Sequence, residues 1–229
     1  MAKFTPGIVI SEIRGKFAAT IFTKNRAGAM IRNRVTPINR RSLSQSMVRQ
    51  EFSSISTTWR SLSQAQRDAW IAATPNFPYQ DTLGQTKLLS GSQLYEQFNR
   101  NLLVIGAAQI TTPPLPTSFS VLTFGAITLS AAAFTVGFTP DPVEADRELV
   151  VYATRPVSAG VDAFRNSDFR FVQSFTAAQA SPADINSAYE AIFGTKTGLV
   201  GQKIGVQIKL VEISSGIAST PLRTAALIA

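Results

Sequence analysis

The sequence predicts an α+β protein: an N-terminal part with short strands and about three helices, then an all-β immunoglobulin-like or fibronectin type III-like sandwich with one inserted helix. Three observations predict this fold. Residues 36–74 carry an apolar stripe with helical spacing, short β-rich runs dominate the second half, and a segment with three prolines separates the two. Because such a segment favours an extended chain and forbids helix, we place the domain boundary there, giving domains of residues 1–112 and 113–229.

The chain begins with short strands. We expect them at residues 8–10, 17–22 and 29–35, separated by turns at residues 13–16 and 25–28. In the third strand, alternation places Met30, Arg32 and Arg34 on one face and Ile31 and Val35 on the other. One face of this small sheet is therefore expected to be basic.

Residues 36–74 predict two amphipathic helices joined by a capped turn. In the first helix, apolar residues recur at intervals of three and four: Met47, Val48, Phe52, Ile55, Trp59 and Leu62. Ser63 and Gln66 have the spacing of a capping box, so the second helix begins there. We expect a helical core of Phe52, Trp59, Leu62 and Trp70, because two large indoles can close a small core. A third helix is predicted over residues 92–105.

The second half contains about seven β-rich runs in roughly 110 residues, the number that a sandwich requires. They span residues 119–124, 126–129, 134–138, 148–154, 168–175, 203–213 and 223–228. One helix interrupts them, with Ser181 as its N-cap, Pro182 in its first turn and Gly194 at its end. The chain has no Cys, so a disulfide between the sheets is excluded.

The net charge of +8 is concentrated near the N-terminus. Residues 1–70 hold twelve Lys and Arg against three acidic residues, whereas residues 71–229 hold ten against eleven. This asymmetry predicts an anionic partner, and nucleic acid, an acidic protein surface and anionic lipid are the candidate classes. A solvated surface that binds nothing is the simplest alternative. The expected basic interface comprises Arg14, Lys16, Lys24, Arg26, Arg32, Arg34, Arg40 and Arg41.

The composition excludes several kinds of catalytic site. Without Cys or His, the chain cannot supply a thiolate nucleophile, a His base or a His/Cys zinc site. The acidic run at residues 141–148 lacks the spacing of an EF-hand loop, and residues 194–198 lack that of a phosphate-binding loop. A Ser or Thr nucleophile with a Lys base, or a pair of carboxylates, stays open for catalysis. No such residues cluster in the sequence, so we expect no enzymatic activity, catalytic residue, metal, cofactor or small-molecule substrate. The longest apolar run, residues 102–108, is too short to span a membrane, so we expect no membrane partner.

Several segments together resemble a known family. They are residues 13–16 (IRGK), 21–28 (IFTKNRAG), 31–39 (IRNRVTPIN) and 59–70 (WRSLSQAQRDAW), and the similarity extends to residues 90–101 and to the β-rich half. As a set they resemble a family of uncharacterised virion-associated structural proteins of tailed bacteriophages and prophages. The resemblance implies a structural role and supplies no catalytic residue.

A looser resemblance involves Phe52, Trp59 and Trp70, whose spacing is similar to the junction of helices 2 and 3 in HMG-box DNA-binding domains. The strands that precede these helices do not belong to that fold, and any capped helical hairpin closed by tryptophans shows a similar pattern.

We therefore expect a non-enzymatic structural protein of a tailed bacteriophage virion, as a capsid decoration or minor capsid protein or as a neck or tail component. It would assemble in the host bacterial cytoplasm and dock through its basic N-terminal part on capsid, portal or tail subunits, in multiple copies per particle. The alternative is a nucleic-acid-binding protein that is packaged with the genome or contacts it. On the structural interpretation, nucleic-acid binding should be weak and non-specific.

Overall fold

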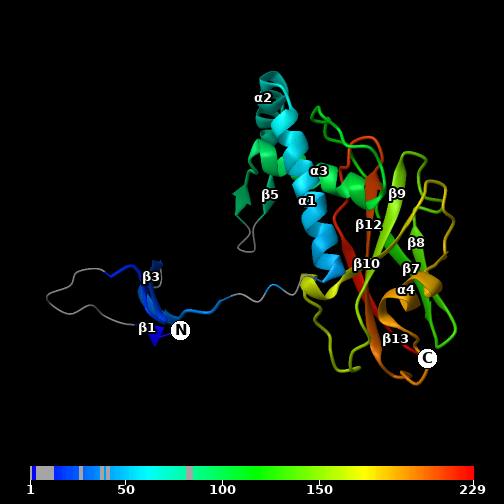
Figure 1. Ribbon diagram of the computed structural model, residues 1–229. Coiled ribbons are helices and arrows are strands. Elements are labelled where there is room, and N and C mark those ends of the chain that lie inside the picture. The colour runs from blue at the N-terminus through cyan, green and yellow to red at the C-terminus, as the bar shows by residue number, and fades with distance from the viewer. Residues whose placement is uncertain (1, 4–12, 26–27, 37–38, 40–41, 81–84) are drawn as a thin grey trace. The chain divides into compact units, whose positions relative to one another are not determined.

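The structure is a computed structural model that describes residues 2–3, 13–25, 28–36, 39, 42–80 and 85–229 (Figure 1). The chain divides into two compact units, an N-terminal unit of residues 1–46 and a main unit of residues 47–229. The fold is mixed α+β, as the sequence predicts, with a small N-terminal sheet, helices, and antiparallel C-terminal sheets with one helix inserted between two of their strands.

The N-terminal unit contains an antiparallel sheet with the strand order β1-β4-β3-β2. The strands are β1 (Ala2–Lys3), β2 (Gly15–Phe17), β3 (Thr20–Asn25) and β4 (Gly28–Asn33). The strand predicted at residues 17–22 is in fact the end of β2 and the start of β3, because the chain reverses at Ala18, whose φ is 48°. β3 and β4 pair up to Asn25 and Gly28, the two ends of the turn predicted at residues 25–28. Residues 26–27 and the strand predicted at residues 8–10 lie outside the described residues.

Three helices open the main unit. They are α1 (Leu43–Ser61), which begins in the last residues of the N-terminal unit, α2 (Gln64–Ala73) and α3 (Gly91–Val104). A 3₁₀ turn (Thr74–Asn76) and a two-stranded hairpin of β5 (Tyr79–Gln80) and β6 (Thr86–Lys87) connect α2 to α3. Capping boxes start α2 at Ser63 and α3 at Ser90, where the serine hydroxyl accepts from a backbone N–H three residues later and the Gln side chain there accepts from the serine N–H.

The helical core is centred on Trp70, which is fully buried together with Tyr95. The two rings meet edge to face with their centroids 5.3 Å apart, and Leu62 is also buried. Trp59 is half-buried against the same core, 5.3 Å from the Tyr95 ring. Phe52 does not join this core: it is 38% exposed, and its ring lies against Arg100 of α3, with the guanidinium carbon 5.1 Å from the ring centroid.

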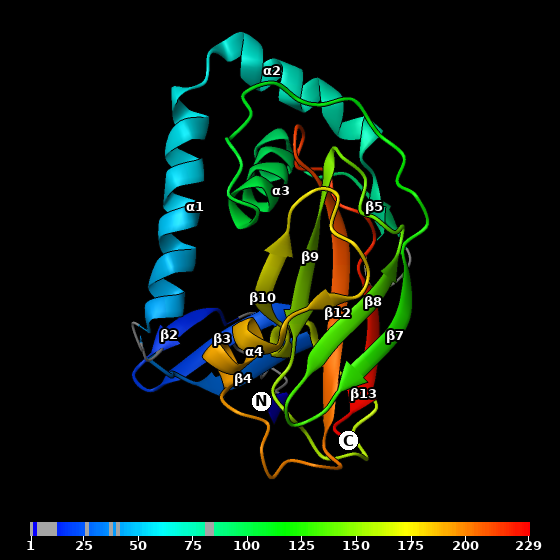
Figure 2. The same cartoon turned by 90° about the vertical axis from the view of Figure 1, so that its right-hand side faces the viewer.

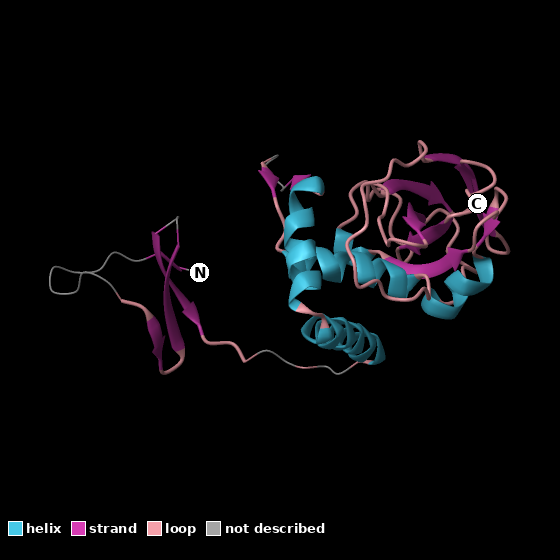
Figure 3. Ribbon diagram, turned by 90° about the horizontal axis from the view of Figure 1, so that it is seen from above, coloured by secondary structure: helices cyan, strands magenta, loops and turns pink. Residues whose placement is uncertain are grey.

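The rest of the main unit is a seven-stranded antiparallel sandwich (Figure 2). Its strands are β7 (Thr123–Leu129), β8 (Phe134–Thr139), β9 (Arg147–Ala153), β10 (Arg170–Phe175), β11 (Ala183–Asp184), β12 (Lys203–Glu212) and β13 (Leu222–Leu227). One sheet has the order β11-β8-β7 and the other β10-β9-β12-β13 (Figure 3). One buried apolar cluster fills the space between their facing sides. The fourth strand, β10, pairs with β9 rather than joining the sheet of β7, β8 and β11, which is the fibronectin type III-like arrangement.

Two local predictions for the sandwich need correction. The runs at residues 119–124 and 126–129 form one strand, β7, with an irregular register between Phe124 and Ile127. The inserted helix, α4 (Asn186–Phe193), begins later than predicted, because Ala183–Asp184 pairs with β8 as β11. Ser181 caps no helix; its hydroxyl accepts from the Phe138 backbone N–H at 3.0 Å.

The helices and the sandwich belong to one compact unit. The Asn101 side chain of α3 donates to the carbonyl of Gly216 at 2.8 Å, and Ile217, from the turn after β12, packs in the helical core. The predicted boundary at residues 112 and 113 therefore falls inside the main unit. The buried sandwich core nevertheless comes only from residues after 118, so independent folding of residues 113–229 stays a prediction.

Candidate functional site

The basic sheet, meaning β1 to β4 of the N-terminal unit, places two of the expected interface residues in one row. Lys16 pairs with Ile21, and Ile21 pairs with Arg32, so the three residues lie side by side across β2, β3 and β4. Residues in register on neighbouring antiparallel strands project from the same face. Lys16 and Arg32 are both exposed, so this row presents two cations on either side of an aliphatic side chain.

The opposite face of the basic sheet is more apolar. Phe22 pairs with Ile31, and Phe17 pairs with Thr20, which places both aromatic rings on the face away from Arg32. Phe17 is 76% exposed. Lys24 alternates with Phe22 and therefore shares this second face, so the expected basic residues do not all lie on one side.

Other residues of the expected interface lie at the ends of strands. Arg14 directly precedes β2, and Arg34 directly follows β4, where its backbone N–H donates to the carbonyl of Ala19 at 2.7 Å. Both side chains are exposed. Arg26, Arg40 and Arg41 lie outside the described residues.

The boundary between the two units separates the charge completely. Residues 1–46 contain nine Lys and Arg against one Glu, whereas residues 47–229 contain thirteen of each sign. The entire net charge of +8 therefore belongs to the N-terminal unit. Both buried apolar clusters lie in the main unit, and no N-terminal residue whose side chain the structure describes is buried.

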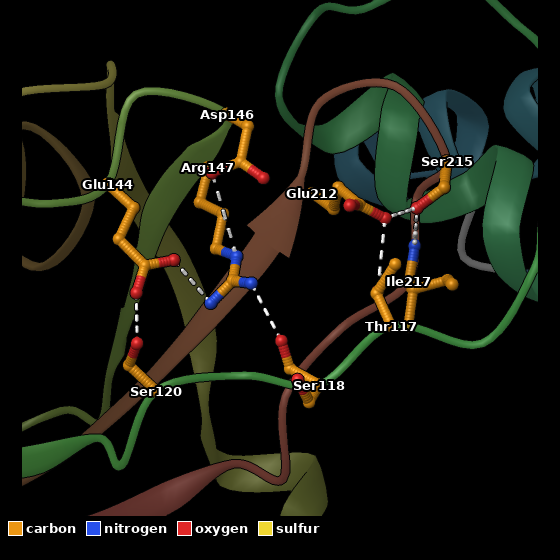
Figure 4. Close-up of polar contacts among 9 residues, drawn as sticks. All are labelled: Thr117, Ser118, Ser120, Glu144, Asp146, Arg147, Glu212, Ser215 and Ile217. Carbon is orange, nitrogen blue, oxygen red and sulfur yellow. Dashed lines mark hydrogen bonds and ion pairs between the residues drawn. The ribbon is translucent and has the colours of Figure 1, made fainter.

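The acidic run at residues 141–148 serves a structural purpose. Arg147 is 8% exposed, donates to the carbonyl of Ser118 at 2.7 Å and forms an ion pair with Glu144 at 2.5 Å (Figure 4). Glu144 also accepts from the Ser120 hydroxyl. These contacts hold residues 118–120 against the sandwich, and no group of acidic residues suited to a metal ion occurs among the described residues.

A second buried group, Glu212, holds the same connecting segment. Its carboxylate accepts from the hydroxyls of Thr117, at 3.3 Å, and Ser215 (Figure 4). Sequence reasoning missed both Arg147 of β9 and Glu212 of β12, since each contacts residues 117–120, which lie far from it along the chain. The sequence did contain a signal: Arg147 stands at the start of one apolar β-rich run, and Glu212 stands near the end of another.

Lys196, which lies in the segment 194–198, is not free to bind phosphate. It is fully buried, and its ammonium pairs with Glu190 at 2.8 Å and donates to the Asn186 side chain. The ion pair joins α4 to the loop that follows it, which explains a buried Lys without any ligand.

A cavity of about 550 Å³ lies between residues 76–78, the segment 116–122 and the turn 217–222. Phe77 and Phe119 line it together with prolines and hydroxyl groups, and none of its lining residues is charged. The Ser120 hydroxyl of this lining donates to the Glu144 carboxylate, which also pairs with Arg147 and holds the segment in place.

Comparisons of the chain with protein-family models, with curated proteins and with solved structures found no match. Among the described helices, none combines the length and the apolar character needed to cross a bilayer. A functional interpretation therefore depends on the geometry of this chain's own residues.

Proposed function

We propose that this chain is a non-enzymatic structural protein of a tailed-bacteriophage particle, attached through its basic sheet to an acidic surface of a neighbouring capsid, portal or tail subunit. The observation that carries the proposal is the separation of charge: the unit of residues 1–46 holds the whole net charge of +8, while the unit with the buried cores is neutral. A surface so uniformly charged favours binding to a partner of opposite sign.

The composition of the basic sheet suits a protein partner. Arg32 can pair with a carboxylate through two parallel hydrogen bonds, and Lys16 places a second cation in the same row. Phe17 offers exposed apolar area on the other face. A sheet normally buries one face against another element, and the described residues of this sheet bury none, so a partner surface would complete its packing.

The assignment to a phage particle rests on the resemblance of residues 13–16, 21–28, 31–39, 59–70 and 90–101 to virion-associated proteins. The main unit fits a structural role, since a sandwich tolerates variation in its loops while the core stays intact. Its charged residues at Arg147, Glu212 and Lys196 hold the fold together.

The proposal can be tested by reversing the charge of one row of the basic sheet. The double variant Lys16→Glu/Arg32→Glu should stay folded by circular dichroism, because both side chains are exposed, but should be lost from purified particles. The matched control reverses two exposed cations of the main unit, Arg60→Glu/Arg155→Glu, and should enter particles at the normal copy number. Normal incorporation of the Lys16/Arg32 variant would contradict docking through this sheet.

The second candidate, nucleic-acid binding, is favoured by one observation: the basic sheet carries an exposed aromatic ring, Phe17, of the kind on which bases can stack. Binding through phosphates would weaken with salt, by about one logarithmic unit of slope per contacted phosphate. We expect only weak binding of this kind. Sub-micromolar binding to duplex or single-stranded DNA at physiological salt, lost in the Lys16/Arg32 variant, would favour the second candidate instead.

A further inference from the structure

The sandwich sheet β10-β9-β12-β13 carries a lysine, Lys209, on its outer face, where α3 contacts the sheet. Residues of β12 alternate, and Ile208 and Leu210 face the sandwich core, so Lys209 projects outward. Lys209 is paired with Val150 of β9, which makes Glu148 and Tyr152 its diagonal neighbours on the outer face.

Lys209 has a hydrogen-bond partner but, within the part of the chain that the structure describes, no ion-pair partner. Its ammonium donates to the Asn101 side chain at 2.8 Å and lies 5.6 Å from the centroid of the Tyr152 ring. Burial and the nearby charge of Arg100 lower the pKa of Lys209 to about 8. Burial alone raises the pKa of Glu148, so Lys209 does not stabilise that carboxylate as an ion pair would.

Arg100 of α3 is the second cation at this place. Its guanidinium carbon lies 5.1 Å from the centroid of the Phe52 ring on α1, so the planar group stacks on an aromatic side chain. Arg100 directly precedes Asn101, whose side chain accepts from the Lys209 ammonium, so Arg100 belongs to the turn of α3 that contacts Lys209. Among the described residues, no carboxylate forms an ion pair with Arg100 or Lys209, and Arg100 is exposed.

Apolar side chains surround the two cations. Phe52 is 38% and Phe171 41% exposed, and the Phe171 ring lies 5.9 Å from that of Tyr152. We call Phe52, Arg100, Tyr152, Phe171 and Lys209 the cationic-aromatic face; contacts or electrostatic coupling link its members in one series. Arginine and aromatic residues are the types that are enriched at the centres of protein interfaces.

We propose that the cationic-aromatic face binds an Asp or Glu side chain of a protein partner, in a segment that places an apolar or aromatic residue beside the carboxylate. Arg100 would hold the carboxylate through two parallel hydrogen bonds, and Lys209 would supply the second positive charge. The exposed rings of Phe52 and Phe171 would contact the apolar neighbour.

The net charge of the cationic-aromatic face favours a single carboxylate over a nucleic-acid backbone as its ligand. The face contains two cations with Glu148 beside them, so it balances about one negative charge, whereas a run of phosphates needs a row of cations. The exposed aromatic rings add affinity only for a ligand with an apolar part. This second attachment point belongs to the neutral main unit and does not depend on the function proposed for the basic sheet.

The experiment is a titration of the isotope-labelled full-length protein, followed by NMR at the Arg100 side chain and at the backbone amides of β9 and β12. The probe is N-acetyl-Asp-Phe-amide, with N-acetyl-Asn-Phe-amide as the uncharged match and inorganic phosphate as the second anion. We expect saturable shifts with the Asp probe in the millimolar range, and none with the Asn probe. Arg100→Gln should weaken binding at least about tenfold, the loss expected for charge-assisted hydrogen bonds.

A matched variant separates this face from charge in general. Lys203 on the same strand pairs with Asp162 at 2.7 Å, so Lys203→Met should leave binding of the Asp probe unchanged, while Lys209→Met should weaken it. Equal binding of the Asn probe, no saturable shift, or full binding by a folded Arg100→Gln variant would each overturn the proposal. Tighter binding of phosphate than of the Asp probe would also overturn it, since the face would then select phosphate.

Discussion

Gly216 offers the sharpest test of how the helices are fixed to the sandwich. It lies in the turn after β12 with a φ of 71°, and its carbonyl accepts from the Asn101 side chain at 2.8 Å. A Cβ at this position would lie 2.3 Å from the carbonyl oxygen of Phe98 and 2.9 Å from the Leu102 side chain. Both residues belong to α3, so Gly216→Ala should force the turn away from this helix.

The expected cost has three parts. A left-handed conformation costs alanine about 1 kcal/mol relative to glycine. The backbone oxygen of Phe98 cannot rotate away, so the turn and α3 must separate, which weakens the Asn101 hydrogen bond by about 1 kcal/mol. Repacking of Leu102 around the added methyl group costs roughly 1 to 3 kcal/mol. The sum is about 3 to 5 kcal/mol.

Gly198 provides a matched control. Its φ is 78°, but no atom lies within 4 Å of the position that a Cβ would take. Gly198→Ala should therefore lose only the conformational part, about 1 kcal/mol. Urea unfolding followed by tryptophan fluorescence and circular dichroism measures both free energies. If the two variants were destabilised equally, the close contact between the turn and α3 would be refuted.

Two further predictions concern the main unit. Burial and Arg100 lower the pKa of Lys209 from 10.5 to about 8, so between these pH values the folded state binds fewer protons than the unfolded state, and stability should rise with pH. The comparison is with Lys209→Met, which keeps Arg100, Glu148 and Tyr152. The difference in unfolding free energy between the wild type and this variant should rise by up to about 3 kcal/mol from pH 8 to pH 10.5. A constant difference from pH 7 to 10 would contradict the lowered pKa of Lys209. A fragment of residues 114–229 should give a dispersed NMR spectrum, because it contains the whole buried sandwich core, and in it Gly216→Ala should cost no more than Gly198→Ala. A disordered spectrum would show that this core needs the helices.

Local signals in the sequence predict local structure well. Ser63 and Gln66 have the spacing of a capping box, and α2 begins at Gln64 as this spacing requires. The same spacing occurs at Ser90 and Gln93, where α3 begins one residue before the predicted start. Such signals succeed because the residues that form the contact lie within one helical turn.

Periodicity predicts which face of a helix is apolar, but not what covers it. Met47, Val48 and Phe52 share the stripe of α1 with Ile55, yet only Ile55 is buried. Ile55 is buried because it packs in one cluster with Trp70 of α2 and Tyr95 of α3, which both come later in the chain. No pattern within residues 43–61 contains that information.

The candidate surfaces show the same limit. Charge counts locate the basic unit, but the face on which each cation lies depends on strand register, and the turn at Ala18 divides a run that reads as one strand. The cationic-aromatic face is less accessible to sequence reasoning, because Asn101 and Lys209 are 108 positions apart and meet only once α3 is packed on β12.

The unequal charge of the two units affects both the folding of the main unit and the proposed binding of a partner by the basic sheet. A net charge of +8 on the unit with the cores would oppose compaction through self-repulsion, and the chain avoids this by keeping residues 47–229 neutral. The basic sheet contains no buried residue among those described, so neutralisation by an acidic partner would remove repulsion and cover apolar area at once. On the proposed function, long-range attraction would set the rate of encounter through the basic sheet. The cationic-aromatic face, with only Arg100 and Lys209 as its charges, would add short-range contacts that act on the rate of dissociation.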